Sequence, residues 1–210
     1  MSYKITELND GPLKLESDKS IIYKDGVLLE TENQVHLCRC GLSNNKPFCD
    51  GKHNSVNFSS KREISEEIIQ NYKGKSISII FNRSICAGAG ECVRNLPTVF
   101  KSESSSEWIY PDNDKNEKII KTIKDCPSGA LSYSIQGRTD LDDSSVAKIT
   151  IIKNGPYNVE SVHLEHLTAP TNFSTRKYSL CRCGHSKNKP YCDYSHSDKK
   201  WDDEKTEERI

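Results

Sequence analysis

The chain has 210 residues, of which 34% are hydrophobic and 29% charged, and its mean hydropathy is −0.72. This thin supply of apolar side chains disfavours one large core and favours small modules that a bound metal helps to fold. The formal net charge is zero, with 30 basic and 30 acidic residues, which argues against a broad nucleic-acid-binding surface. Residues 1–20 lack the apolar core of a secretory signal, and no apolar run approaches the roughly 18 residues of a membrane span. We therefore expect a soluble, cytoplasmic protein.

The first third of the chain is predicted to form short β-strands that lead to a metal-binding loop. Residues 21–23 and 27–29 are apolar runs on either side of an Asp-Gly turn, which predicts a β-hairpin. Residues 35–37 form a further short strand that leads directly into Cys38. Asp50 is placed to cap a short helix that carries His53.

The middle third differs in pattern and predicts a small α+β module. The elements expected in chain order are a helix over 62–72, with helical spacing of Ile64, Ile68 and Ile69, a strand over 76–81, a short strand over 108–110 that ends at Pro111, an amphipathic helix over 114–125 with Ile119, Ile120 and Ile123 on one face, a closing strand over 130–135, and a polar linker over 136–145.

The last third repeats the first. Asn154-Gly155-Pro156 matches Asp10-Gly11-Pro12 as the turn that opens each unit. Residues 178–180 match the strand before the first metal loop, and Asp193 matches Asp50 as a cap. Residues 197–210 are densely charged with mixed signs and are interpreted as a solvated tail or a frayed helix.

The nine cysteines fall into three groups of three, and a disulfide framework would leave one thiol over in each group. Because no secretion signal is present, we expect the thiols to stay reduced and to bind metal. The outer groups repeat the pattern C-x-C-x8-C-x3-H, with a shift of 143 residues. The repeated ligand candidates are Cys38, Cys40, Cys49 and His53 in the first unit, and Cys181, Cys183, Cys192 and His196 in the second.

Three thiolates and one imidazole suit either a tetrahedral zinc ion or one 2Fe-2S cluster, and the ligand types alone do not separate the two. The C-x-C start is less usual for zinc fingers, which favour wider knuckles. The full motif Cys-Arg-Cys-Gly-x-Ser-x3-Pro-x-Cys-Asp-Gly-x-His resembles the CDGSH (mitoNEET-like) iron-sulfur family over about residues 9–58 and 153–197. The first site departs from the family motif at Lys52, where the motif has serine, and the second has Tyr194 in place of glycine.

The resemblance implies a 2Fe-2S cluster on three cysteines and one histidine at each site. A single histidine ligand should raise the reduction potential above that of an all-cysteine cluster, and it links cluster retention to pH. Members of the family dimerise through a shared β-rich cap, so an intramolecular pseudo-dimer of the two units is expected here. Inert zinc staples at both sites are the alternative.

The central group of cysteines resembles that of a single-cluster, bacterial-type ferredoxin over about residues 76–135. Cys86 and Cys92 bracket a run of small residues, and Cys126 is followed by Pro127, but Ala89 stands where the bacterial pattern has its middle cysteine. Three protein ligands match a 3Fe-4S cluster. A 4Fe-4S cluster stays open, with its fourth iron on water, a thiol or another side chain, and so do empty or structural cysteines.

Two further sets of residues need an interpretation. His36, His163, His166 and His185 lie outside the repeated ligand positions and are interpreted as ordinary surface or packing residues. Arg39 and Arg182 recur between the ligands. They are expected either to offset cluster charge and bond sulfur or backbone, or to be solvated surface charges.

We therefore predict an α+β fold with two small β-rich metal-binding units, over 9–58 and 153–197, that flank a ferredoxin-like domain over 76–135 and precede a charged tail over 198–210. The predicted function is electron transfer or cluster transfer to a redox partner or an apo-protein acceptor, with no nucleic-acid or membrane partner. A redox or iron sensor and a zinc-stapled scaffold are the alternatives. The sequence has no nucleotide-binding motif and no nucleophile–base pattern, so we do not expect an enzyme.

Overall fold

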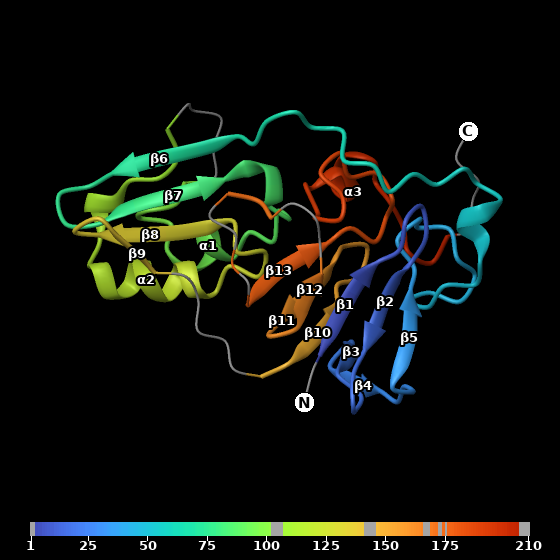
Figure 1. The fold of residues 1–210 in the computed structure, drawn as a ribbon. Helices are drawn as coiled ribbons and strands as arrows, with labels where there is room; N and C mark the ends of the chain where they lie inside the picture. The colour runs from blue at the N-terminus through green and yellow to red at the C-terminus, as the bar shows by residue number, and fades with distance from the viewer. Residues whose placement is uncertain are drawn as a thin grey trace.

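The computed structural model describes residues 3–101, 107–140, 146–165, 169–171, 174 and 176–205, and it shows an α+β fold built on three small sheets (Figure 1). The sheets of the first and last thirds lie together in one half of the molecule, and the sheet and helices of the middle third form the other half (Figure 1). Among the described residues, no helix has the length and apolar character needed to cross a membrane. The predicted α+β class is confirmed.

The two outer units use matching strands. The first third contains β1 (Lys4–Glu7), β2 (Leu13–Glu16), β3 (Ile22–Lys24), β4 (Val27–Leu29) and β5 (Gln34–Leu37); the last third contains β10 (Lys148–Ile151), β11 (Tyr157–Glu160), β12 (His163–Glu165) and β13 (Lys177–Leu180). β2 and β11 each follow a Gly-Pro turn and alternate buried with half-buried side chains, as expected for a strand with one face on a core. The predicted hairpin and the strands before both metal loops are confirmed.

The outer units exchange strands: the last unit lends β12 to the sheet of the first, and the first lends the β3–β4 hairpin to the sheet of the last. β12 lies parallel to β1, with Leu164 opposite Ile5, and β3 lies parallel to β10, with Ile22 opposite Ile149. The resulting sheet orders are β12-β1-β2-β5 and β13-β11-β10-β3-β4. All four of these paired side chains are buried, so the exchange gives the two units one shared apolar core.

The middle domain is an antiparallel sheet covered by helices. The sheet order is β6 (Ile69–Lys73), β7 (Ser78–Asn82), β8 (Leu131–Ile135) and β9 (Arg138–Asp140). The helical elements are the 3-10 turn η2 (Arg83–Ile85), α1 (Glu91–Asn95), the 3-10 turn η3 (Pro111–Asn113) and α2 (Asn116–Lys124). α2 buries Ile119 and Ile123 and runs beneath the sheet (Figure 1), which confirms the amphipathic helix expected in this region.

Several local predictions for the middle third are wrong. The helix expected over 62–72 is absent: residues 62–68 form no helix, and residues 69–73 form strand β6, all five pairing with β7. Ile68 and Ile69 are exposed, so their helical spacing does not mark a buried face. The expected linker contains β9, which pairs with β8, while residues 141–145 lie outside the described residues. The strand expected over 108–110 is reduced to a single bridge between Ile109 and Phe100.

The predicted solvated tail is also wrong in part. Residues 198–205 are described, and within them the half-buried Trp201 and Asp203 contact the metal-binding half of the molecule. Residues 206–210 lie outside the described residues. The end of the described chain is therefore docked on the body of the protein.

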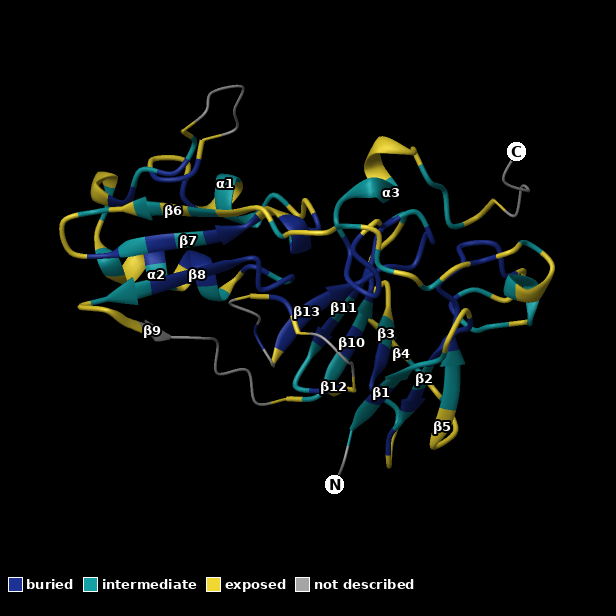
Figure 2. Cartoon of the chain, turned by 45° about the horizontal axis from the view of Figure 1, so that its top comes forward, coloured by how far each residue is buried: buried dark blue, intermediate teal, exposed yellow. Residues whose placement is uncertain are grey.

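The expectation that the chain lacks one large core is wrong, because a single apolar core runs through all three sheets. Its buried members include Leu13 from the first unit, Tyr178 from the last and Phe81 from the middle domain. Figure 2 shows that β13 is buried along its length and that β7, β8 and β11 each contain buried residues. A small separate cluster joins Cys38 and Cys40 to Leu42 and Phe58. The middle domain is thus packed against the outer units through this shared core.

Candidate metal centres

The repeated ligand candidates converge in pairs at the ends of two equivalent strands. β5 ends at Leu37, immediately before Cys38, and β13 ends at Leu180, immediately before Cys181. His53 lies in the 3-10 turn η1 (Lys52–Asn54), and His196 lies in the short helix α3 (Ser195–Asp198). The structure therefore places all eight predicted residues in two loops of the same design.

The distances within each pair suit a common metal ion. The Sγ atoms of the two C-x-C cysteines are 3.6 Å apart in the first site and 3.7 Å apart in the second. The distance from the third cysteine Sγ to the histidine Nδ1 is 3.3 Å in both sites. A tetrahedral metal with bonds of about 2.3 Å to sulfur and about 2.0 Å to nitrogen would hold such atoms roughly 3.8 and 3.6 Å apart. Each site thus presents a Cys–Cys pair and a Cys–His pair, which fits a centre with two metal ions.

The surroundings of the first cysteine of each site lower its pKa and so favour the thiolate form. A hydrogen bond from Cys40, together with the backbone N–H groups of Ser43 and Gly41, lowers the pKa of Cys38 to about 6. In the second site, a hydrogen bond from Cys183 and backbone N–H groups lower the pKa of Cys181 to about 7. Converging N–H groups form a concave anion site, which stabilises the charged sulfur that a metal requires.

The aspartate after the third cysteine closes each loop. Asp50 accepts hydrogen bonds from the backbone N–H groups of Lys52 and Asn44, at 3.0 and 2.8 Å. Asp193 accepts the equivalent pair from Ser195 and Lys187, at 3.0 and 2.9 Å. The cap residues themselves are Gly51 and Tyr194, and the aspartates act from one residue earlier. The predicted capping role is confirmed in this modified form.

The arginines between the ligands are structural clamps. Arg39 and Arg182 are both only 2% exposed, so the prediction of solvated surface charges is wrong. The Nε group of Arg39 donates to the carbonyl of Gly11, and that of Arg182 donates to the carbonyl of Gly155. Each guanidinium therefore ties its metal loop to the Gly-Pro turn that opens its own unit.

Each buried guanidinium also has an acidic partner. Arg39 pairs with Glu7, and Arg182 pairs with Asp203. The partner in the first unit comes from β1, whereas the partner in the second comes from the segment after α3. Sequence reasoning missed Asp203 because the surrounding residues 197–210 are so rich in charge. Trp201, the only aromatic side chain of that segment, was the available signal that it docks.

The three central cysteines line one small cavity in the middle domain, although they come from separate elements. Cys86 follows η2, Cys92 lies in α1, and Cys126 follows α2. Burial, then the charge of Cys126 and that of Cys86, raises the pKa of Cys92 to about 12. Glu91 and Ser128 also line the cavity, and the Ser128 hydroxyl lies 3.7 Å from the Cys126 sulfur.

Two family models agree with this geometry. The family model described as "Iron-binding zinc finger CDGSH type" matches residues 10–54 and 154–197. The chain contains two CDGSH iron-binding domains. The family model described as "Divergent 4Fe-4S mono-cluster" matches residues 72–136, between the two CDGSH units. The protein is thus an iron-sulfur protein with three iron-binding modules in one chain.

The curated relatives include the uncharacterized protein YjdI of Escherichia coli strain K12 and of Escherichia coli O157:H7. Each is 40% identical to this chain over 62 residues, which is 30% of this chain and 80% of the relative. No solved structure gives a significant match.

The two CDGSH sites touch each other. The hydroxyl of Tyr157, from the second unit, lies 2.8 Å from the carbonyl oxygen of Cys38 and 3.0 Å from that of Pro47, in the first metal loop. A Cβ atom added to Gly41 would lie only 2.4 Å from the carbonyl oxygen of Cys183. The Trp201 indole N–H donates to the carbonyl of Gly41 at 3.4 Å. Residues outside the ligand pattern therefore hold the two loops together.

The second CDGSH site also lies near the central cysteines. Burial, then the charge of Cys181, raises the pKa of Cys192, and Cys86 of the middle domain adds to this effect. The ring of Tyr194, two residues after Cys192, also lies against Gly88, two residues after Cys86.

The other histidines are placed as follows. His36 lies in β5, and its carbonyl accepts the Cys49 N–H at 2.8 Å. His185 donates its backbone N–H toward the Cys183 sulfur at 3.4 Å. His163 is exposed on β12, and His166 lies outside the described residues.

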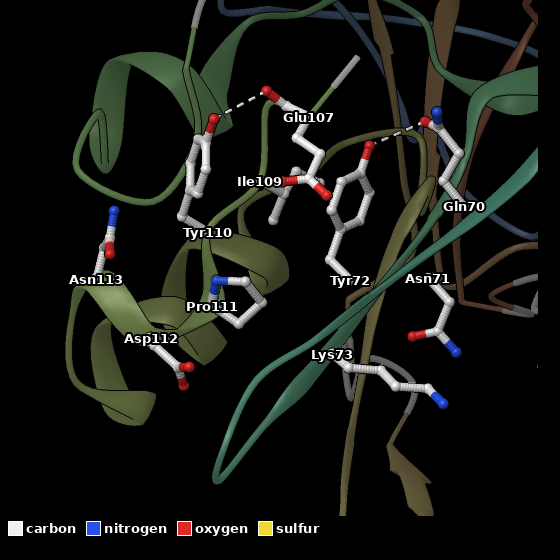
Figure 3. A pocket seen from close by; sticks show the side chains of 10 residues that line it. All are labelled: Gln70, Asn71, Tyr72, Lys73, Glu107, Ile109, Tyr110, Pro111, Asp112 and Asn113. Carbon is white, nitrogen blue, oxygen red and sulfur yellow. Dashed lines mark hydrogen bonds between the residues drawn. The ribbon is translucent and has the colours of Figure 1, made fainter. Parts of the chain in front are cut away.

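A polar groove of about 750 Å³ lies away from the cysteines, between β6 and the segment around η3 (Figure 3). The Tyr72 hydroxyl donates to the Gln70 side chain at 3.2 Å, and the Tyr110 hydroxyl donates to the Glu107 carbonyl at 3.1 Å. These tyrosine hydroxyls bond to the wall of the groove itself, which gives no indication of a ligand.

Proposed function

We propose that this protein carries electrons to or from a partner protein through three redox centres held in one polypeptide. Cys38, Cys40, Cys49 and His53 would hold one 2Fe-2S cluster, and Cys181, Cys183, Cys192 and His196 a second. Cys86, Cys92 and Cys126 would hold a 3Fe-4S or 4Fe-4S cluster. When bound, such clusters supply one-electron carriage over a wide range of potentials.

The observation that carries this proposal is the contact between neighbouring ligand loops. Tyr157 and Gly41 join the first CDGSH site to the second, and Gly88 of the central loop lies against Tyr194 of the second site. The second site thus contacts both other ligand loops, an arrangement that would give an electron carrier short steps from centre to centre. The exchanged strands β3 and β12 support the intramolecular pseudo-dimer that fixes this arrangement.

The side chains around the central cavity bear on the type of cluster there. The matching family model is described as a 4Fe-4S mono-cluster, and the chain offers three cysteines. Ser128 lines the same cavity with its hydroxyl 3.7 Å from the Cys126 sulfur, and it is our candidate for a fourth ligand. We favour a 4Fe-4S cluster with an oxygen ligand, and a 3Fe-4S cluster is the alternative.

The cysteines suit a reducing compartment, as expected for a cytoplasmic protein. All nine lie among the described residues, and none forms a disulfide. We propose that the partner is a redox protein rather than a nucleic acid or a membrane, and that the chain is not an enzyme by itself.

A second candidate function is the donation of a cluster to an apo-protein. The first site favours it, because Cys49 and His53 are only half-buried and an added Cβ at Gly51 would meet no atom within 4 Å. An acceptor could therefore approach this Cys–His edge directly.

A reductive titration of the anaerobically purified protein, followed by mixing with an apo-ferredoxin, tests both functions. An electron carrier takes up electrons reversibly over repeated cycles and retains its iron. Loss of the visible spectrum in the first cycle would contradict the carrier. Rapid appearance of iron in the apo-ferredoxin would support the donor.

A further inference from the structure

Tyr194 has an unusual backbone conformation beside the second metal site. Its φ is +81°, and Gly51 at the equivalent position of the first site has φ +87°. The left-handed region suits glycine and is unfavourable for a bulky L-residue. The second unit therefore keeps the turn that the loop requires but places an aromatic ring on it at a cost in strain, so the ring must make compensating contacts.

The ring of Tyr194 lies directly on the central cysteine loop. A Cβ added to Gly88 would be 2.0 Å from Cδ2 and 2.1 Å from Cε2 of this ring, distances that no real side chain could tolerate. Gly88 lies between Cys86 and Cys92 and has φ +70°. The close approach therefore requires both a glycine in the middle domain and a tyrosine in the second CDGSH unit.

The Tyr194 ring also contacts a candidate metal ligand, His196. The rings of Tyr194 and His196 meet edge to face, with centroids 5.7 Å apart and an interplanar angle of 73°. One side chain thus contacts the histidine of the second centre and the backbone of the central loop.

Further contacts hold the same interface. The Arg83 guanidinium lies 6.0 Å from the centroid of the Tyr194 ring, and its Nη1 donates to the Asp193 carbonyl at 3.4 Å. The buried amide of Asn188 donates to the Ser84 carbonyl at 2.7 Å. In the first unit, by contrast, Asn45 at the position of Asn188 is exposed.

We infer that Tyr194 is a positioning residue that locks the central cluster loop onto the His196 side of the second site and so makes those two centres one coupled pair. Only the role of this contact in electron passage between the two centres rests on the proposed function. The contact itself does not depend on that role. The first site, which has glycine at this place, remains open for an external partner.

The test compares Tyr194→Gly with two controls in the protein as purified. Tyr194→Phe keeps the ring and should retain the contact. Gly51→Tyr puts a tyrosine on the same turn of the first site, where an added Cβ meets no atom within 4 Å. The readouts are hydrogen exchange of the amides in residues 87–90 and the magnetic interaction between paramagnetic centres in partly reduced protein.

We expect Tyr194→Gly to speed exchange over residues 87–90 by about tenfold, since an aromatic contact of ordinary strength is lost, and to weaken the magnetic interaction. Tyr194→Phe and Gly51→Tyr should leave both readouts as in the wild type. Gly88→Ala should speed exchange at least as much as Tyr194→Gly, and in the Tyr194→Gly background only the effect of its left-handed backbone strain should remain, because the clash with the ring is gone.

Unchanged exchange and unchanged magnetic interaction in Tyr194→Gly would overturn the inference, as would an equal response to Gly51→Tyr. Failure of the proposed function looks different. If the protein binds zinc and takes up no electrons, but exchange over residues 87–90 still rises only in Tyr194→Gly and Gly88→Ala, the positioning role stands and the redox purpose falls.

Discussion

The two CDGSH sites have the same ligands and spacing but different surroundings. Cys192 is 2% exposed, whereas its counterpart Cys49 is half-buried. The turn before the histidine is covered by the central loop in the second site, through Tyr194, and is open in the first, at Gly51. Burial lowers the pKa of His196, which disfavours protonation of this ligand. The motif fixes the local loop, and residues outside it decide how far each centre is exposed.

The largest expected effect comes from crowding the contact between the two CDGSH loops. Gly41→Ala places a Cβ 2.4 Å from the Cys183 carbonyl oxygen at a left-handed backbone position, so the loops must move apart. We expect the free energy of unfolding to fall by about 3 kcal/mol. Denaturant titration of the purified protein measures this loss.

Gly51→Ala is the matched control for that experiment. It has the same sign of φ, but the added Cβ meets nothing within 4 Å, so only the backbone strain of about 1 kcal/mol should appear. Equal losses in the two variants would show that the loop contact contributes nothing.

The next effect concerns the acidic partners of the buried arginines. Asp203→Ala leaves the guanidinium of Arg182 buried without its carboxylate and should reduce the free energy of unfolding by about 2–3 kcal/mol. Burial opposes ionisation of Asp203, but the hydrogen bond and charge of Arg182 outweigh it and lower its pKa. The contribution of the pair is therefore present above the ordinary aspartate pKa and is lost as the pH falls through the lower value of the folded protein.

Glu7→Ala is the counterpart in the first unit. The side chain of Glu7 is 21% exposed and that of Asp203 is 10% exposed, so water can replace more of the Glu7 interaction. Denaturation at pH 7 should show the smaller loss for Glu7→Ala, and the reverse order would refute the assigned difference in burial.

The histidine ligands can be compared through their effect on potential. His53→Cys replaces a neutral imidazole by a thiolate, a stronger donor, and should lower the potential of the first centre by on the order of 100 mV. The same change should make that centre less sensitive to acid. A redox titration followed by optical spectra measures the shift, and His163→Gln, a change on exposed β12, should leave the potential alone. An unshifted potential in His53→Cys would remove His53 from the ligand set.

The smallest effect tests whether the second unit supports the first metal loop. Tyr157→Phe removes the hydroxyl that lies 2.8 Å from the Cys38 carbonyl and should cost about 1 kcal/mol. Hydrogen exchange over residues 38–48 should become about fivefold faster. Tyr178→Phe removes a hydroxyl that donates to Val162 in its own unit and should not alter that segment. Similar exchange in both variants would argue against support across the units.

Local spacing predicted much of the metal-binding design. The hairpin of β3 and β4, the strands that precede Cys38 and Cys181, and the amphipathic α2 were all readable from the order of residues. Each depends on turns and periodicities within a few residues of one another, which is the range over which sequence patterns carry information.

The errors share a physical cause, which is pairing with a distant segment. β6 forms because residues 69–73 pair with the edge of β7, and the local spacing of apolar residues carries no information about that pairing. The exchange of β3 and β12 and the docking of Trp201 on Gly41 likewise join parts of the chain more than 100 residues apart. Tyr194 was identified from the sequence as a departure from the motif, but its partner Gly88 could not be.

Iron, sulfide and zinc analysis of anaerobically purified protein, with an optical spectrum, tests the central claim most directly. The account predicts a red-brown protein with iron matched by sulfide and about seven or eight iron atoms per chain, which corresponds to two 2Fe-2S clusters and one 3Fe-4S or 4Fe-4S cluster. A colourless protein with about three zinc ions per chain would contradict it and leave a zinc-stapled scaffold.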